Sequence, residues 1–246
     1  MTKPNNKTKK SSGSIKSIFI PIIAFLIFSL CLFPIVLAGK ILLYFIAFDK
    51  FWHFLLLPFI LYIGIVIVVV SLLLISGVII RLFNIRYEPG IYEYTFKNKT
   101  AFRWIVVCSL YTPCRKILEM FPMGRIKIVY YKLLGMKIGK NTLVGGVIKD
   151  PCVTEFGENT TMGEYAVIYG HIHNYEKETI TINKVSIGNN CIIGAGAIVM
   201  PGAVIQDNVT LAAGALVTKN QVLEKGKTYG GIPAKETIKK TKKKTK

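Results

Sequence analysis

The strongest constraint on the fold is a six-residue repeat in the C-terminal half of the chain. From Ile187 to Val217 an aliphatic residue occupies every sixth position, and from Cys191 to Ala215 the fifth residue of each hexad is small or β-branched. Counting back in sixes from Ile168 carries the pattern to Ile138, with Asp150 as the one first position that is not apolar. A period of six matches neither an α-helix nor a simple alternating strand. It predicts a parallel β-helix, in which each hexad contributes a short strand and a corner to one continuous core.

Two charge-free apolar segments precede the repeat. Residues 19–38 and 54–80 carry no charged side chain, and 52% of the whole chain is hydrophobic. About 20 helical residues suffice to cross the hydrocarbon core of a bilayer, so both segments are predicted to be transmembrane helices. A cleaved signal peptide is the competing interpretation of the first segment, because Val36-Leu37-Ala38 resembles a small-residue cleavage site.

Basic residues flank this hairpin on one side. Five lysines precede residue 17 and several arginines and lysines follow residue 80, whereas the connecting loop holds only Lys40, Asp49 and Lys50. The positive-inside rule therefore predicts a multi-pass protein of the cell membrane with both termini and the C-terminal domain in the cytoplasm. The formal net charge of +19 is concentrated partly in the two lysine-rich tails. These tails are expected to meet anionic lipid headgroups or to be solvated and disordered, and no nucleic-acid partner is expected.

Residues 81–136 mix aromatic, basic and apolar side chains at a spacing of three to four. With Pro113 and Pro122 as breakers, they are expected to form two or three short amphipathic helices, lying either on the membrane or against the β-helix. The predicted domains are a basic cytoplasmic tail at 1–17, a two-span transmembrane hairpin at 18–80, an amphipathic helical connector at 81–136, a left-handed β-helix acyltransferase domain at 137–223, and a C-terminal extension with a Lys-rich tail at 224–246.

The repeat resembles that of the hexapeptide-repeat acyltransferases over roughly residues 137 to 235, including a final GGIPAK. The chain is similar to sugar O-acetyltransferases and to the hexapeptide-repeat region of some nonribosomal peptide synthetases. This resemblance implies a mainly β fold, a left-handed parallel β-helix of about four coils behind the hairpin and short helices. It also implies a homotrimer that uses acetyl-CoA or another acyl-CoA as co-substrate and needs no metal.

One insertion, HIHNYEKETITIN, interrupts the hexads, and it is expected to hold the chemistry. It contains His171 and His173, and an imidazole suits a general base at neutral pH. By the resemblance, one histidine takes the proton of an acceptor hydroxyl or amine as that group attacks the acyl-CoA thioester. His171 matches the Gly-His of sugar acetyltransferases, while His173 begins a His-Asn-Tyr-Glu sequence like that of the synthetase region, so His173 is favoured. Glu176 is expected to orient the base; alternatively, both histidines only cap a coil or face solvent.

Small residues in the later hexads suggest where a cofactor would lie. A pantetheine arm needs a surface with little side chain, and IGAGA and LAAGA provide one. By the resemblance, Ala195, Ala213, Thr218 and Lys219 correspond to acetyl-CoA contacts, with the lysine near a phosphate. Small residues also belong at β-helix corners for structural reasons.

Three functions are compatible with these features. The leading one is a membrane-tethered O- or N-acetyltransferase that acts on a small-molecule, lipid or glycan acceptor. A carbonic anhydrase would share the fold but needs three histidine ligands for zinc, and no third histidine exists beyond residue 80. A non-catalytic trimeric membrane scaffold is the remaining alternative.

Overall fold

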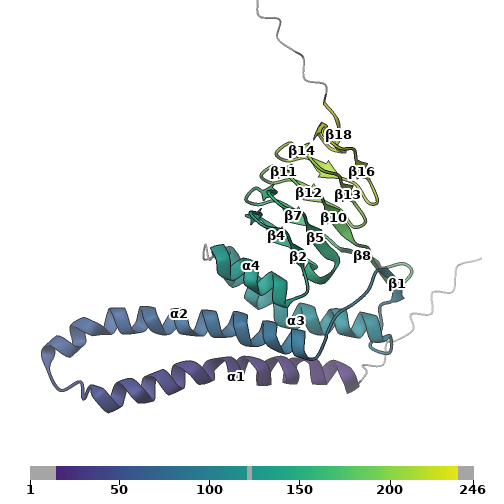
Figure 1. The fold of residues 1–246 in the computed structure, drawn as a ribbon. Helices are drawn as coiled ribbons and strands as arrows, with labels where there is room; N and C mark the ends of the chain where they lie inside the picture. Colours follow the sequence, from purple (N-terminus) through teal and green to yellow (C-terminus); the bar gives the residue numbers. More distant parts are fainter. Residues whose placement is uncertain (1–14, 121–123, 238–246) are drawn as a thin grey trace, which may run out of the picture.

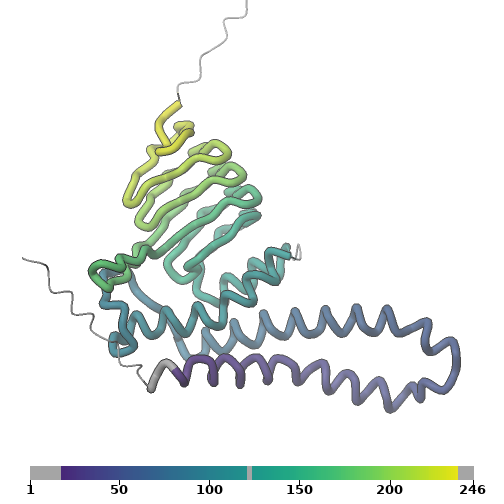
Figure 2. Tube along the Cα trace, turned by 180° about the vertical axis from the view of Figure 1, so that it is seen from behind, coloured from purple at the N-terminus to yellow at the C-terminus, as the bar shows by residue number. Residues whose placement is uncertain are grey.

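The computed structural model describes residues 15–120 and 124–237 (Figure 1). Most of the predicted basic N-terminal tail and the final lysines lie outside the described residues. The described part consists of a long helical hairpin, two further helices and a β-helix that rises from them (Figures 1 and 2). The predicted fold class is therefore confirmed.

Two long helices form the N-terminal hairpin. Helix α1 spans Ile15–Phe45 and α2 spans Phe51–Leu82, and both are long and apolar enough to cross a membrane. At 1.5 Å per residue α2 extends about 48 Å, which exceeds the roughly 30 Å of a hydrocarbon core. Apart from His53, the buried residues of α2 lie between Val69 and Ile80, in its C-terminal half. That half packs on the next two helices, and the other half exposes large apolar side chains.

Helices α3 (Lys99–Met120) and α4 (Gly124–Leu133) lie between the hairpin and the β-helix (Figure 1). The expectation that Pro113 breaks the first of them is wrong, because α3 continues through this residue. On one side, Ser76 of α2 lies 3.4 Å from the Tyr130 hydroxyl of α4. On the other side, the Tyr111 hydroxyl of α3 donates to the carbonyl of Ile148 in the β-helix. The connector thus contacts both neighbours at once.

The β-helix has three parallel sheets, one for each side of a triangular coil. The first contains β2, β5, β10, β13 and β16, the second β3, β6, β11, β14 and β17, and the third β4, β7, β12 and β15. Its four complete coils are followed by two further strands and by β18, which returns antiparallel to β17. The bounds are β2 Lys137–Ile138, β3 Leu143–Val144, β4 Val147–Ile148, β5 Thr154–Phe156, β6 Thr161–Met162, β7 Val167–Ile168, β10 Val185–Ile187, β11 Ile192–Ile193, β12 Ile198–Val199, β13 Val204–Ile205, β14 Thr210–Leu211, β15 Leu216–Val217, β16 Val222–Leu223, β17 Thr228–Gly230 and β18 Lys235–Glu236.

The hexad rule explains the core of this domain. In every two-residue strand except β4 and β18 the second residue is the first position of a hexad and points inward, as with Val199 and Val217, which are fully buried. The small fifth positions, such as Ala197 and Ala215, are also fully buried because they turn the corner inside the coil. Stacked apolar side chains therefore form one core along the whole prism.

The first coil departs from the six-residue count. Ile148 pairs with Ile168, so Ile148 occupies the inward position that counting in sixes gives to Asp150. The corner before it contains only Gly145 and Gly146, and a Cβ on Gly146 would lie 2.2 Å from the Ala166 carbonyl oxygen of the next coil. Only glycine fits so tight a corner. Asp150 consequently lies just beyond β4, before the 3-10 turn η1 (Pro151–Val153).

Candidate functional site

The insertion that interrupts the hexads folds into a β-hairpin. Strand β8 (His171–Asn174) pairs antiparallel with β9 (Thr179–Ile182), and β1 (Gly90–Glu93) from the connector adds to the outer edge of β9. Side chains two residues apart on a strand face the same side. His171 and His173 therefore lie together, with ring centroids 5.4 Å apart.

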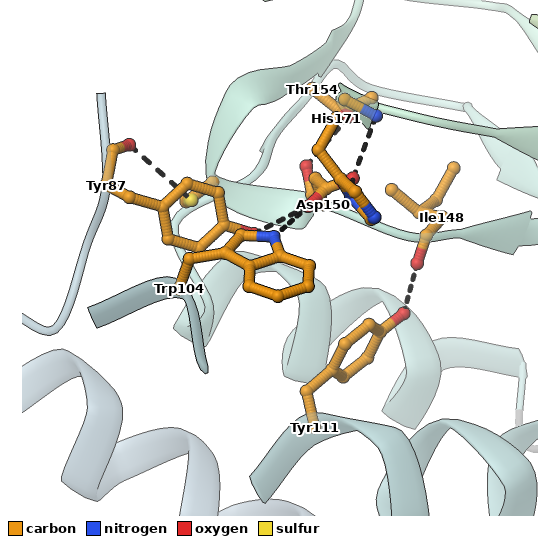
Figure 3. Close-up of polar contacts among 9 residues, drawn as sticks. Tyr87, Trp104, Tyr111, Ile148, Asp150, Thr154 and His171 are labelled. Atoms are coloured by element: carbon orange, nitrogen blue, oxygen red, sulfur yellow. Dashed lines mark hydrogen bonds and ion pairs between the residues drawn. The ribbon is translucent and has the colours of Figure 1, made fainter. Parts of the chain in front are cut away.

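A buried carboxylate holds the first of these histidines. His171 Nδ1 lies 2.7 Å from Asp150 Oδ2, and the Asp150 side chain is fully buried (Figure 3). The backbone N–H of Gly170 donates to the same carboxylate oxygen at 2.8 Å. Trp104 Nε1 and the Tyr87 hydroxyl donate to the other oxygen at 3.1 and 3.0 Å. Two groups of the connector and two of the β-helix thus converge on one carboxylate.

This environment keeps Asp150 ionised. Burial alone would raise the pKa of Asp150, but the bond and charge of His171, the Gly170 N–H and the Trp104 indole together hold that pKa below its usual range. An ionised carboxylate can only accept hydrogen bonds, so His171 Nδ1 carries the proton. Nε2 of His171 is left with the lone pair that a general base needs.

The close approach of Asp150 to the hairpin depends on Gly170. A Cβ at this position would lie 2.6 Å from Val153 Cγ2 and 2.7 Å from the Asp150 Cβ. Side chains are not found so close together, so a larger residue would push the hairpin away from Asp150. Gly170 therefore sets the distance between the carboxylate and His171.

His173 has aromatic rather than ionic neighbours. Its ring stacks on Tyr175 at 5.9 Å and meets the edges of Tyr94 at 4.7 Å and Trp104 at 5.1 Å. Burial and the neighbouring His171 lower the pKa of His173, although Asp150 opposes this shift. His173 is thus neutral at pH 7 and has no bonded carboxylate within the described part of the chain.

Glu176 lies in the exposed turn between β8 and β9. Over residues 15–120 and 124–237 no hydrogen bond or ion pair joins it to either histidine. The carboxylate that binds an imidazole is that of Asp150. The orienting role expected for Glu176 stays a prediction that no contact in the structure supports.

The four residues assigned to the cofactor by resemblance frame one sheet. Ala195 and Ala213 are exposed at the corners that lead into β12 and β15, and Thr218 and Lys219 are exposed where β15 ends. Strand β7 belongs to the same sheet, and His171 follows its C-terminal end. His171 therefore lies at the same edge of the sheet as Thr218 and Lys219, two coils away from them. A single chain therefore places these residues around the β15-β12-β7-β4 sheet without bringing the alanines to the histidines.

A pocket of about 600 Å³ lies at the foot of the alanine edge. It is bounded by α4 and by the corner residues Gly145, Gly163 and Tyr165, among others. Gly163 stacks directly on the backbone of Ala195, since a Cβ on it would lie 2.6 Å from the Ala195 nitrogen. The exposed small-residue edge and this pocket are therefore continuous.

Sequence reasoning missed three members of the site. Asp150 carried a signal, because it is the one polar residue in the first-position series. Tyr87 and Trp104 carried none, since nothing in the connector sequence indicates that it folds back onto the β-helix. The hydrogen bonds from Tyr87 and Trp104 to Asp150 show that the connector lies against the β-helix.

The described residues do not bring together the side chains that a zinc site needs. Within the described residues no three His, Cys, Asp or Glu side chains lie close enough to hold one metal ion. His171 Nδ1 is already bound to Asp150. A three-histidine centre does not fit these residues.

Comparison with known proteins identifies the repeat. A model of the bacterial transferase hexapeptide family (six repeats) matches residues 184–219, so the predicted hexapeptide repeat is confirmed. A candidate acetyltransferase of Bacillus subtilis, YvoF, is 35% identical over 118 residues, which are 45% of this chain and 64% of YvoF. Gamma carbonic anhydrase 2 of Arabidopsis thaliana is 30% identical over 98 residues, or 40% of this chain and 29% of that protein. The chain thus spans less than two thirds of the length of these curated relatives.

Solved structures of acetyltransferases align with part of this chain. A maltose O-acetyltransferase from Clostridium difficile 630 aligns with 61% of this chain and 91% of its own, at 16% identity and a TM-score of 0.45.

Proposed function

We propose that this hexapeptide-repeat protein is a CoA-dependent acyltransferase, with acetyl-CoA as the expected donor. The observation that carries the proposal is the Asp150–His171 pair, whose histidine lies on the one insertion in the repeat. The relationship to YvoF supports the same class of reaction. The acceptor is a hydroxyl or amine on a small molecule, lipid or glycan.

His171 acts as the general base in this mechanism. Its Nε2 takes the proton of the acceptor as the acceptor oxygen or nitrogen attacks the thioester carbonyl carbon. The C–S bond then breaks, the acyl group stays on the acceptor, and the CoA thiolate recovers the proton from the imidazolium. Asp150 keeps Nδ1 protonated and stabilises the positive charge that His171 carries between the two transfers.

The preference for His173 is reversed in this proposal. The local sequence favoured His173, but His171 has the buried carboxylate partner and His173 has a depressed pKa and aromatic neighbours. A base needs a defined tautomer and a means to hold positive charge. His173 is assigned instead to the wall of the acceptor site, beside Tyr94 and Tyr175.

The CoA arm is proposed to follow the small-residue edge. Ala195 and Ala213 leave space for pantetheine, Lys219 meets a phosphate, and Thr218 lies beside it. Because the alanines and His171 occupy different edges of one sheet, a neighbouring chain is proposed to complete the site. No metal takes part in this mechanism.

A homotrimer follows from this shared site. A prism of about four coils also has flat exposed faces that chain packing would cover. Mass measurement in detergent, corrected for bound detergent, is expected to give three chains. A monomer with full activity would refute both the trimer and the shared site.

We also propose that α1 and α2 anchor the enzyme in the cell membrane, with both termini and the β-helix in the cytoplasm. Their exposed apolar surface and the flanking basic residues support this arrangement. An impermeant maleimide added to intact cells is expected to label Asp49→Cys and to miss Lys244→Cys. The opposite labelling pattern would rule the topology out.

The activity itself is tested with the full-length protein. Purified protein is incubated with labelled acetyl-CoA and membrane extract, and the labelled product is identified. The unmodified chain is expected to transfer the labelled acetyl group, and His171→Ala is expected to lose this transfer. Absence of both acyl-CoA binding and transfer would favour the non-catalytic scaffold.

A further inference from the structure

A second pocket, which adjoins the proposed reaction site at Tyr87, has a strongly basic wall. It encloses about 380 Å³ between the segment after α2, helix α3 and the foot of the β-helix. Four basic residues from four separate segments line it: Arg86, Arg103, Lys137 and Lys184. The chain therefore gathers positive charge here from positions far apart in the sequence.

Most of this charge is not neutralised. Lys184 Nζ lies 2.6 Å from Glu155 Oε1, which also accepts from the Ser186 hydroxyl at 2.8 Å. Over the described residues Arg86, Arg103 and Lys137 form no ion pair, and Glu88 is the one other acidic residue of the lining. The pocket thus has four cations against two anions, and one of those anions is already occupied.

The two arginines are partly held in place by backbone contacts. Arg103 Nη1 donates to the carbonyl oxygen of Arg86 at 3.5 Å. The Arg86 guanidinium lies over Gly135, where a Cβ would come within 3.2 Å of Nε. Gly135 has φ +97°, so glycine is also favoured by the backbone at this point. Both guanidinium groups therefore lie at the wall of the pocket, where a ligand would meet them.

We propose that this pocket binds a phosphate group. Arginine guanidinium groups bind phosphate oxygens through paired N–H donors, and Lys137 adds a further positive charge beside them. A volume of about 380 Å³ is sufficient for a phosphomonoester or a diphosphate. Lys219, the lysine assigned to a CoA phosphate, lies at the far end of the β-helix, so this pocket is a separate site.

Two sources of phosphate are chemically equivalent in this pocket. The first lining residue, Asn84, lies two residues after the end of α2, so the headgroup of an anionic lipid reaches the pocket when the hairpin is in a membrane. A soluble phosphorylated compound could enter as well. Both would make the same contacts with Arg86 and Arg103.

The test uses full-length protein in a non-ionic detergent. Binding of inorganic pyrophosphate and of dihexanoyl phosphatidic acid is measured by calorimetry for the unmodified chain and for Arg86→Gln/Arg103→Gln. The matched control is Arg125→Gln/Lys225→Gln, which removes the same charge from exposed positions outside the pocket. Thermal unfolding of each variant establishes that it is folded.

Loss of the two guanidinium groups is expected to weaken pyrophosphate binding at least about tenfold, while the control binds as the unmodified chain does. Arg86→Lys/Arg103→Lys should bind between the two, because it keeps the charge without the paired donors. If Arg86→Gln/Arg103→Gln also binds phosphatidic acid more weakly by the same factor, the pocket is a headgroup site. If only its pyrophosphate binding is weakened, the ligand is a soluble compound. Undetectable binding of both probes, or equal binding by the pocket and control variants, overturns the proposal.

Discussion

Replacing His171 with alanine is expected to lower turnover about 10²- to 10⁴-fold, the usual contribution of general acid–base catalysis. The expected loss falls on turnover because, in the proposed mechanism, the imidazole acts in the transition state, whereas acyl-CoA is proposed to bind along the β-helix edge. Transfer of label from acetyl-CoA into the acceptor measures the effect. Acyl-CoA binding and the mass of the assembly should remain unchanged.

His173→Ala is the matched control, since it removes the second imidazole from the same strand. It is expected to reduce turnover by less than about tenfold, because its ring contacts Tyr94 and Tyr175, has no carboxylate partner among the described residues, and is proposed to line the acceptor site. If His173→Ala carries the large loss and His171→Ala does not, the base is His173, as the local sequence suggested. A folded double variant with the unmodified rate would falsify a histidine base altogether.

The β-helix could be predicted because its period is written directly into the sequence. First positions such as Ile193 and Leu211 must fill the prism, so aliphatic residues recur there whatever the function. The shortened corner at Gly145-Gly146 could not be predicted, because it depends on how closely the second coil approaches. That shift is why Asp150 was counted as a core position, although it lies beyond β4 and binds His171.

The remaining parts of the site depend on tertiary contacts. Trp104 lies on α3, a helix whose amphipathic pattern fits a membrane surface and a protein surface equally well. Only in the folded chain does the Trp104 indole reach Asp150. There its ring also lies edge to face with that of His171, with the two ring centroids 4.7 Å apart. Strand β1 is similar, because its partner β9 lies almost ninety residues further along the chain.

These contacts also connect the hairpin to the candidate site. The α3 helix contacts α2 through Cys114, whose sulfur lies 3.5 Å from the Ser76 hydroxyl. The same helix contacts the β-helix through Trp104 and Tyr111. The helical connector is therefore part of the wall that holds Asp150, and the β-helix cut free at residue 137 would lack two of the four donors to that carboxylate.

Replacing Asp150 with alanine is expected to destabilise the fold by about 3 kcal/mol or more. The change leaves the Trp104 indole, the Tyr87 hydroxyl and the Gly170 N–H without an acceptor in a fully buried place, at about 1–3 kcal/mol for each unpaired donor. Trp104→Phe removes one donor and keeps the carboxylate, so this variant should lose much less stability than Asp150→Ala. Thermal unfolding of the full-length protein in detergent measures both. Equal stability of Asp150→Ala and the unmodified chain would contradict this account of the site.

Asp150→Asn separates the charge of this side chain from its volume, and its effect should depend on pH. It is expected to lower turnover at least about 10²-fold, because a neutral amide neither fixes the His171 tautomer nor stabilises an imidazolium. The pKa of Asp150 in the folded chain lies below the ordinary value of 3.8, so ionised Asp150 contributes stability above about pH 4 and loses it as pH falls through the folded pKa. The difference in unfolding midpoint between the unmodified chain and Asp150→Asn should therefore shrink as the pH falls below about pH 4. A difference that stays constant or grows down to about pH 3 would mean that Asp150 is not held ionised by its neighbours, and the orientation of His171 would need another cause.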